Sequence, residues 1–560
     1  MLSLNDLHGQ LDPVLVQSGE TPPRTLRVGG AEALVAQVAQ IRREEAARGR
    51  AVILLDAGDF MQGSVLSNHF EGVPVRDLHV RLGVDGAAVG NHEFDFGPVG
   101  PKGTGGPDPR GALKAWAKAA PFPLLAANIA PKGGGELGWP NTRPTLLIER
   151  GGVKVGVIGL ATTETPATSH LENVGDLEFA PYEPVVKKHA RALRAEGAEV
   201  VVLLAHEGGS CRTRDPASCS GPMPRLLRAL PRGTVDAAIA AHSHGCFWHE
   251  VNGVPLVQAC SKGVALGRIA IRVRGGRVRA EALSPQVVCH DVFGDTGDCE
   301  AGLRHGPARG EVLESPLLRA PAPAVSAMRS ILDGYRRRLS PRPDEVLARA
   351  ARPLHHGRKG VSAMGAFVTA VMRAAVPGAE MALMNAGGVR GGFAAGPVTY
   401  ADVHRVFPFD NQLAVVELTA AELREILEAY MARESHGHLI ASGMAYKVRC
   451  TDPMKVVALT DSRGRPLSER RRYRVAISDF LLAGGVGFGE VLARLPASRK
   501  RLIAGRLIRD ELVKSLKRLG RPLNSRAHPV LPKGPPPVVE LDGPCGGAEP
   551  KAARGRPICR

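Results

Sequence analysis

The chain of 560 residues is long enough for two or three domains, and its 44% hydrophobic residues are typical of a globular protein. Its formal net charge of +18 suits anionic partners, but no dense run of lysine and arginine with interleaved aromatics indicates nucleic-acid binding. No apolar stretch reaches the roughly 18 residues of a transmembrane helix, so none is expected.

Residues 1–300 alternate short apolar, β-favouring runs with helical stretches, such as the helix expected over residues 31–48. This alternation is typical of a layered α/β domain. Polar side chains follow five of the apolar runs, at the places where strands are expected to end. Open α/β sheets bind ligands at strand ends, so we expect one site there. The five segments are 5–9, 58–59, 90–95, 205–207 and 241–244.

The donors in these segments are carboxylates, imidazoles and one amide, which suit Zn²⁺, Mn²⁺ or related divalent ions such as Co²⁺ and Mg²⁺. Two such ions roughly 3.5–4 Å apart can clamp a phosphate and activate a water. Two close cations repel, so a carboxylate must bridge them, and Asp59 is the candidate. We predict Asp6, His8, Asp59 and His244 on one ion and Asp59, Asn91, His206 and His242 on the other.

His92 and Asp95 are predicted to form a catalytic pair rather than to bind metal. If Asn91 ligates through its amide oxygen, the adjacent His92 side chain is left to face a substrate. Asp95 would hold His92 in one tautomer and stabilise its cationic form. The pair would then protonate the leaving oxygen or stabilise charge on phosphorus. The alternative is that Asp95 only caps the next turn.

The second half of the chain predicts a linker and another domain. A Gly/Pro-containing transition leads to a helix expected over residues 326–339, which Pro341 and Pro343 end. A second α/β unit follows and closes with an amphipathic helix. The predicted divisions are a domain over residues 1–305, a linker with a helix over 306–344, a domain over 345–526 and a Pro/Gly-rich, disordered tail over 527–560.

The chain has nine cysteines, and their pairing indicates the cellular compartment in which the protein works. Three close pairs lie in polar stretches and predict loop disulfides, which form in oxidising compartments. The alternative is a cytoplasmic protein with scattered free thiols. The pairs are Cys211 with Cys219, Cys289 with Cys299, and Cys545 with Cys559.

With these motifs the chain resembles the 5′-nucleotidase family of metallophosphoesterases, which includes periplasmic UDP-sugar hydrolases and cyclic-nucleotide phosphodiesterases. Segments 384–390, 407–411 and 473–488 extend the likeness across residues 1–525. The resemblance implies an N-terminal layered α/β/β/α metallophosphoesterase domain and a C-terminal α/β substrate-binding domain. It also implies that a metal-bound hydroxide attacks phosphorus in the phosphate ester of a nucleotide.

The resemblance further implies a nucleotide-binding set in the second domain. Phe409 and Phe488 would sandwich the base, because an aromatic ring stacks on any base. Asn385 and Arg390 would bind phosphate or ribose, and Arg358 would add a positive contact. Three departures from the family pattern bear on ribose selectivity and metal binding: Val486 stands for the usual Asp, His244 stands for the usual Gln, and segment 362–367 lacks the usual Asn residues.

These residues leave other functions open: a UDP-sugar or 2′,3′-cyclic-nucleotide hydrolase, a thiosulfate-ester hydrolase, or a non-catalytic binding protein. The expected partner is a nucleotide or a related small molecule, and no nucleic acid. The family and the cysteine pairs imply a periplasmic or secreted protein. Because the chain starts four residues before Asn5 and shows no export signal, we expect a truncated or processed start.

Overall fold

The computed structural model describes residues 1–18, 24–100, 106–211, 215–294, 298–300, 311–319, 322–339, 343–357, 362–432, 438–449, 454–520, 522–523 and 538–540. These residues form two compact units. Unit 1 holds the described residues of 1–165 and 172–338, and unit 2 holds those of 166–171 and 339–540. Most of the tail expected from residue 527 lies outside the described residues.

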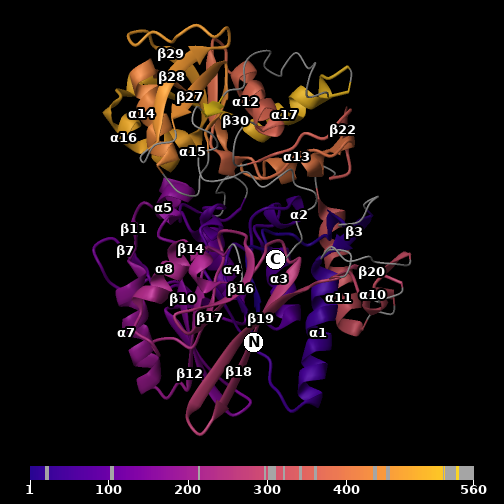
Figure 1. Ribbon diagram of the computed structural model, residues 1–560. Helices are drawn as coiled ribbons and strands as arrows, with labels where there is room; N and C mark the ends of the chain where they lie inside the picture. Colours follow the sequence, from indigo (N-terminus) through magenta and orange to yellow (C-terminus); the bar gives the residue numbers. More distant parts are fainter. Residues whose placement is uncertain are drawn as a thin grey trace. The chain divides into compact units, whose positions relative to one another are not determined.

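Unit 1 is built on two mixed sheets (Figure 1). Their central strands run parallel. Antiparallel strands complete both edges of the six-stranded sheet and one edge of the seven-stranded sheet. The seven-stranded sheet has the order β19 (Arg277–Val287), β18 (Ala265–Arg274), β1 (Leu2–Leu4), β4 (Leu54–Asp56), β5 (Gly86–Ala88), β6 (Leu124–Leu125) and β8 (Thr142–Arg143). The six-stranded sheet has the order β16 (Cys246–Val251), β17 (Val254–Ala259), β15 (Ala237–Ile239), β12 (Val200–Ala205), β10 (Val153–Leu160) and β9 (Thr145–Arg150).

The two sheets pack face to face over a core to which both contribute, for example through Leu55 and Ala88 from one sheet and Val157 and Val202 from the other. Helices cover the outer faces, which gives the expected α/β/β/α layers (Figure 1). The helices of unit 1 are α1 (Ala31–Ala47), α2 (Val65–Asn68), α3 (Val73–Leu82), α4 (Gly111–Ala119), α6 (Leu171–Val174), α7 (Tyr182–Ala195), α8 (Pro222–Ala229), α10 (Pro316–Arg319) and α11 (Pro323–Arg338). Helix α5 (Thr165–Thr168) belongs to unit 2 except for its first residue, and α6 belongs to unit 1 except for its first residue.

Four short antiparallel pairs complete the described part of unit 1. They are β2 (Val14–Gln17) with β3 (Thr25–Val28), β7 (Ile129–Pro131) with β11 (Leu177–Phe179), β13 (Ser210–Cys211) with β14 (Cys219–Ser220), and β20 (Asp291–Phe293) with β21 (Val312–Glu314).

Parallel strands explain why the five polar segments meet. Strands β1, β4, β5, β12 and β15 each end just before one of them. Parallel pairing of β1 with β4, β4 with β5, and β12 with β15 brings the carboxyl ends to the same edge of each sheet. Strand pairing therefore brings the segments together within each sheet, and the face-to-face packing of the two sheets brings the two sets together.

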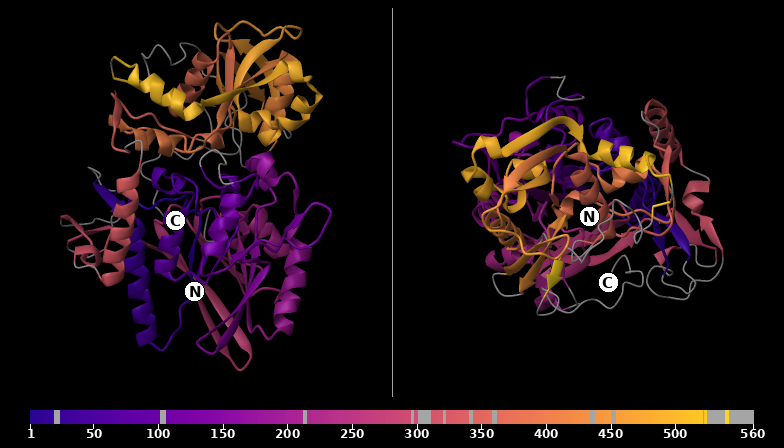
Figure 2. Two further views of the ribbon diagram at one scale, coloured as in Figure 1. Left: turned by 180° about the vertical axis from the view of Figure 1, so that it is seen from behind. Right: turned by 90° about the horizontal axis from the view of Figure 1, so that it is seen from above.

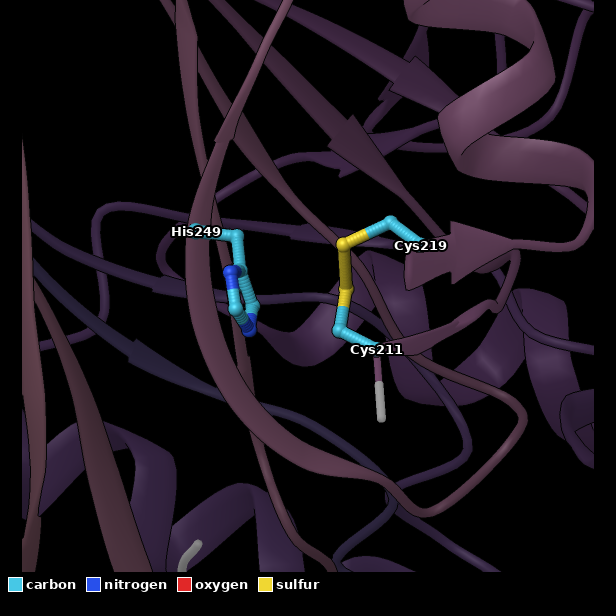
Figure 3. Close-up of side chains that lie close together, drawn as sticks. All are labelled: Cys211, Cys219 and His249. Atoms are coloured by element: carbon cyan, nitrogen blue, oxygen red, sulfur yellow. A yellow bond between two sulfur atoms is a disulfide. The ribbon is translucent and has the colours of Figure 1, made fainter. Parts of the chain in front are cut away.

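Two of the expected disulfides are confirmed, Cys211–Cys219 and Cys289–Cys299. A third, Cys246–Cys260, joins the first residue of β16 to the residue after β17 and was not expected. Figure 3 shows Cys211–Cys219 beside the imidazole of His249. Both sulfurs are in the disulfide and offer no thiolate, so we assign no metal there. Cys545 and Cys559 lie outside the described residues.

Unit 2 is a second α/β layer structure, with hydrophobic clusters on both faces of a five-stranded sheet (Figure 2). That sheet has the order β26 (Ile440–Ser442), β23 (Met381–Met384), β29 (Tyr473–Ser478), β25 (Gln412–Leu418) and β30 (Lys500–Leu507). The smaller sheets are β28 (Lys455–Asp461), β27 (Met444–Arg449) and β31 (Val538–Glu540), and β22 (Val346–Ala350) with β24 (Gly396–Thr399).

The helices of unit 2 include two with reciprocal N-terminal capping boxes, at Thr399 and Thr419. They are α12 (Ala363–Ala375), α13 (Tyr400–Val406), α14 (Ala420–Met431), α15 (Asp479–Leu482), α16 (Gly489–Arg494) and α17 (Ile508–Lys517). In the described part of the whole chain, no helix is long and apolar enough to cross a membrane.

Candidate active site

The first donor cluster lies at the end of β1. Asp6 is fully buried, and one of its oxygens, Oδ1, accepts the backbone N–H of His242 at 3.0 Å. Its other oxygen accepts the Asn5 amide at 2.7 Å. The imidazole Nε2 atoms of His8 and His244 lie 3.0 Å apart, and that of His244 is 3.4 Å from Asp6 Oδ1. Two ring nitrogens and a carboxylate thus converge.

The second cluster lies between the two sheets' strand ends. The His206 Nε2 atom is 3.1 Å from Asp59 Oδ2 and 3.2 Å from Asn91 Oδ1. The Asp59, His206 and His242 donors form one close group. Asp59 Oδ2 is also 3.9 Å from His8 Nε2 in the first cluster, so this carboxylate lies between the two groups. All seven predicted metal-binding side chains are therefore brought together.

Backbone carbonyls set the tautomers of two of these histidines. The Nδ1 atom of His206 lies 2.8 Å from the carbonyl of Ala57, and that of His8 lies 3.1 Å from the carbonyl of Gln62. Each Nδ1–H can donate to its carbonyl, which leaves Nε2 with a lone pair directed at the cluster. Metal-binding histidines are held in this way, so the donors fit divalent ions.

The backbone at the site is strained. Of the eleven non-glycine residues with positive φ in the described chain, five are predicted ligands. Positive φ costs an L-residue on the order of 1–3 kcal/mol and persists where the surroundings impose it. Such outliers concentrate at functional sites, so this clustering independently marks the strand-end edge. The five are Asp6, His8, Asp59, His242 and His244.

The electrostatics of the site favour cations. Asp6 and Asp59 are buried, and within the described residues neither carboxylate pairs with the side chain of a lysine or arginine. Burial raises the pKa of Asp6 to about 6. Burial would also raise the pKa of Asp59, but His206 and His92 hold it well below its usual value. Although burial opposes it, the Asp59 charge raises the pKa of His206 to about 10. These carboxylates attract positive charge strongly, as a metal centre does.

Glu93 holds two of the site loops together, a role that sequence reasoning missed although the residue lies inside a recognised motif. One of its oxygens accepts the backbone N–H groups of Phe60 and Met61, at 2.9 and 3.2 Å. The other accepts those of Asp59 and Gly90, at 2.8 and 2.7 Å. Burial and the Asp59 charge raise the pKa of Glu93 to about 8. This carboxylate fixes the backbone on which Asp59 and Asn91 stand.

His92 and Asp95 lie as the sequence suggested. His92 opens the short 3-10 helix His92–Phe94, and its Nδ1 atom is 2.6 Å from Asp95 Oδ2. Its Nε2 atom points toward the metal-ligand group, 4.0 Å from Asp59 Oδ2. The backbone N–H of His92 donates to Asp59 Oδ1 at 2.9 Å. The imidazole is thus oriented by a carboxylate at the edge of the donor cluster.

The second unit contains the residues expected to bind a nucleotide. Asn385 is buried, and its Oδ1 atom has no hydrogen-bond partner among the described residues. The Arg390 backbone N–H donates to Val406 O at 2.8 Å, which ties the two loops together. Phe409 is half-buried, with one edge against Phe407. These side chains belong to adjacent loops of unit 2.

The base-stacking role expected for Phe488 does not agree with its position in the structure. Its ring is 0% exposed and packs in the hydrophobic cluster around α14, so it has no free face for a base. The family resemblance had implied that this ring stacks on the base. Arg358 lies outside the described residues.

Arg509 is a residue of this unit that the sequence did not suggest. Its buried guanidinium donates to the carbonyls of Pro408 and Phe409 and pairs with Asp410, and it thereby fixes the loop that carries Phe409.

An α/β/β/α domain with carboxylate, imidazole and amide donors at its strand ends defines a metallophosphoesterase. Comparison with known families agrees: the calcineurin-like phosphoesterase model matches residues 2–246, and the 5′-nucleotidase C-terminal domain model matches residues 344–494. The chain therefore carries both domains of the 5′-nucleotidase family of metallophosphoesterases, and it is a metal-dependent phosphoester hydrolase.

Individual relatives give the same result. The chain is 27% identical to the Bacillus subtilis endonuclease YhcR, over 86% of this chain but 37% of that protein. It is 26% identical to Escherichia coli UshA, over 80% of each. Among solved structures, a 5′-nucleotidase precursor from Thermus thermophilus matches with a TM-score of 0.76 at 25% identity, covering 97% of this chain and 99% of that one.

Proposed function

We propose that this protein is a two-metal hydrolase of nucleotide phosphate esters. One observation carries the proposal: two donor clusters share the Asp59 carboxylate, whose Oδ2 atom lies 3.1 Å from His206 and 3.9 Å from His8. Divalent ions bound there would supply Lewis acidity and a water nucleophile at neutral pH. The ligands would be Asp6, His8, Asp59 and His244 on one ion and Asp59, Asn91, His206 and His242 on the other.

The protein's own groups perform the remaining work. His92 gives a proton from Nε2 to the leaving oxygen, and Asp95 keeps the opposite ring nitrogen protonated and stabilises the imidazolium. Glu93 keeps the Asp59 and Asn91 loops at a fixed separation. Because these groups are buried and bonded in place, little reorganisation is needed when charge develops on phosphorus.

Substrate recognition is assigned to unit 2. The partly buried ring of Phe409 would stack on the base with its exposed part, and Arg509 holds its loop. The buried, unpartnered Asn385 oxygen would accept a hydrogen bond from a ribose hydroxyl or the base. Arg390 would bind phosphate by its guanidinium fork. UDP-sugars and 2′,3′-cyclic nucleotides share these recognition elements and are the alternative substrates.

A substrate panel tests the function. The purified protein, stripped with a chelator and reloaded separately with Mn²⁺, Zn²⁺, Co²⁺ and Mg²⁺, is assayed for phosphate release. Nucleoside monophosphates, UDP-glucose, 2′,3′-cyclic nucleotides and a non-nucleotide phosphomonoester are compared. We expect the highest kcat/KM on a nucleotide and none without metal. A preference for the non-nucleotide ester would refute the assignment of unit 2.

The two phenylalanines are expected to behave differently. Phe409→Ala should lower kcat/KM for a nucleotide by roughly 5- to 150-fold, which corresponds to about 1–3 kcal/mol of base stacking, while hydrolysis of a small phenyl phosphodiester changes little. Phe488→Ala should instead lower the free energy of unfolding by about 3–5 kcal/mol, because it empties a core site. Steady-state kinetics and urea unfolding measure both. An equal loss on both substrates for Phe409→Ala would make that residue structural.

We further propose a periplasmic or secreted location. Three disulfides among the described residues support it, because such bonds persist in oxidising compartments.

A further inference from the structure

The hairpin of β18 and β19 extends beyond the rest of its sheet. The two strands pair antiparallel from Ala265 to Arg274 around a Gly275–Gly276 turn. The neighbouring strand β1 pairs with β18 only near its start, at Gly267 and Arg268. In the outer half of the hairpin, residues 269–282, β18 therefore pairs with β19 on one side and with no strand on the other (Figure 1).

The two faces of this outer half differ in character. Ile271, Val273, Val278 and Ala280 pack against the core between the sheets. On the opposite face Glu281 lies exposed across from Ala270. On the same face the register sets Arg272 across from Arg279 and Arg274 across from Arg277, and all four arginines are exposed. We call these four residues the arginine face.

The arginine face keeps a net positive charge, because Glu281 is the one acidic residue in the sequence from 269 to 282. Within the described part of the chain none of the four guanidiniums has an ion-pair, hydrogen-bond or other electrostatic partner, whereas many other arginines of unit 1 do, such as Arg27 with Asp291 and Arg110 with Asp176. Like charges directly across two strands are destabilising. Charged residues on both exposed strands of the hairpin also oppose edge-to-edge pairing with another sheet.

The arginine face cannot serve the active site. The start of β18 lies beside the site, since the Lys262 backbone N–H donates to Asp6 O at 2.7 Å. The strand then runs antiparallel to β1, away from the donor clusters. From Arg268 to Arg274 it rises by a further ~20 Å. The four arginines thus lie at the opposite edge of the sheet from the phosphoesterase centre.

We propose that the arginine face docks unit 1 on an anionic lipid bilayer through the phosphates of its headgroups. Guanidinium forks match phosphate oxygens, and four of them on one flat hairpin present a cationic surface of complementary charge. The face carries no aromatic residue on which bases could stack, which disfavours single-stranded nucleic acid. Its one exposed apolar residue is Ala270, so binding occurs at the headgroups without insertion. Docking in this way turns the active site away from the bilayer.

Vesicle co-sedimentation tests the proposal. The full-length protein is mixed with phosphatidylcholine vesicles with and without phosphatidylglycerol, at low and at high sodium chloride. The variant carries R272Q, R274Q, R277Q and R279Q together. One basic side chain near an anionic leaflet is worth about a fivefold gain in partition, so the variant should lose on the order of 10²–10³-fold. High salt should weaken binding of the unaltered protein in the same direction.

A matched variant distinguishes the effect of the arginine face on vesicle binding from the effect of the protein's net charge. R43Q, R81Q, R191Q and R232Q remove the same charge from exposed, scattered arginines of unit 1 that also lack partners within the described residues. This variant should keep most of the vesicle binding, and both variants should keep wild-type phosphoester hydrolysis. If the quadruple variant fails to fold, the pairs R272Q/R274Q and R277Q/R279Q should each lose about 30-fold.

Three results would overturn the proposal. The unaltered protein could show no preference for anionic over neutral vesicles. The matched variant could lose as much binding as the arginine-face variant. A duplex oligonucleotide could bind more tightly than the vesicles and depend on the same four arginines, which would assign the face to nucleic acid.

Discussion

Asp59→Asn is expected to abolish phosphoester hydrolysis and to lower the metal content of the purified protein. Asp59 is the one carboxylate placed between the two donor clusters, and His206, His8 and His92 surround its Oδ2 atom. An amide has one fewer oxygen donor and no charge, so it cannot bridge two cations. A metal contributes several kcal/mol to the transition state, so kcat should fall by about 10³-fold or more. Phosphate release and elemental analysis measure the two effects.

Asp510→Asn is the matched control, because this aspartate is exposed on unit 2 and the same chemical change there should leave both quantities unaltered. The Asp59 backbone N–H is held by Glu93, so the loop should keep its position in the variant. Full activity of Asp59→Asn, or of protein freed of metal, would contradict the two-metal proposal.

His92→Asn is expected to lower kcat by roughly 10²–10⁴ while metal content stays unchanged. The imidazole is oriented by Asp95 at 2.6 Å and faces the donor cluster without belonging to either ligand group. The link from His92 to Asp59 runs through its backbone N–H, which the substitution preserves. The expected loss is therefore one of proton transfer, and a substrate with a better leaving group should recover part of it.

Asp95→Asn should give a smaller loss, because it removes the orienting carboxylate and leaves the imidazole in place. His69→Asn is the control, since that histidine is exposed. If His92→Asn lost a metal and kept its turnover per remaining site, His92 would be a ligand and the role assigned to it would be wrong.

The convergence of the predicted metal-binding residues could be anticipated from the sequence because each of their segments follows a strand. Parallel pairing brings such strand ends to one edge of a sheet, so the segments that carry Asp6 and His242 could be placed near one another without coordinates. The left-handed backbone of these residues, which directs their side chains, was not predicted. The helix at Ala31–Ala47 and the strand at Val200–Ala205 also follow from local pattern.

The environment of a side chain was decided only by the tertiary structure. Phe488 follows a glycine-rich turn that reads as an exposed loop, yet this turn packs its ring into the cluster around Tyr430 and α14. The four hydrogen bonds to Glu93 and the Cys246–Cys260 disulfide likewise join separate segments of the chain. No local sequence pattern indicates that these segments come into contact. Short-range periodicity fixes which residues end a strand, whereas burial and pairing depend on contacts between segments far apart in the chain.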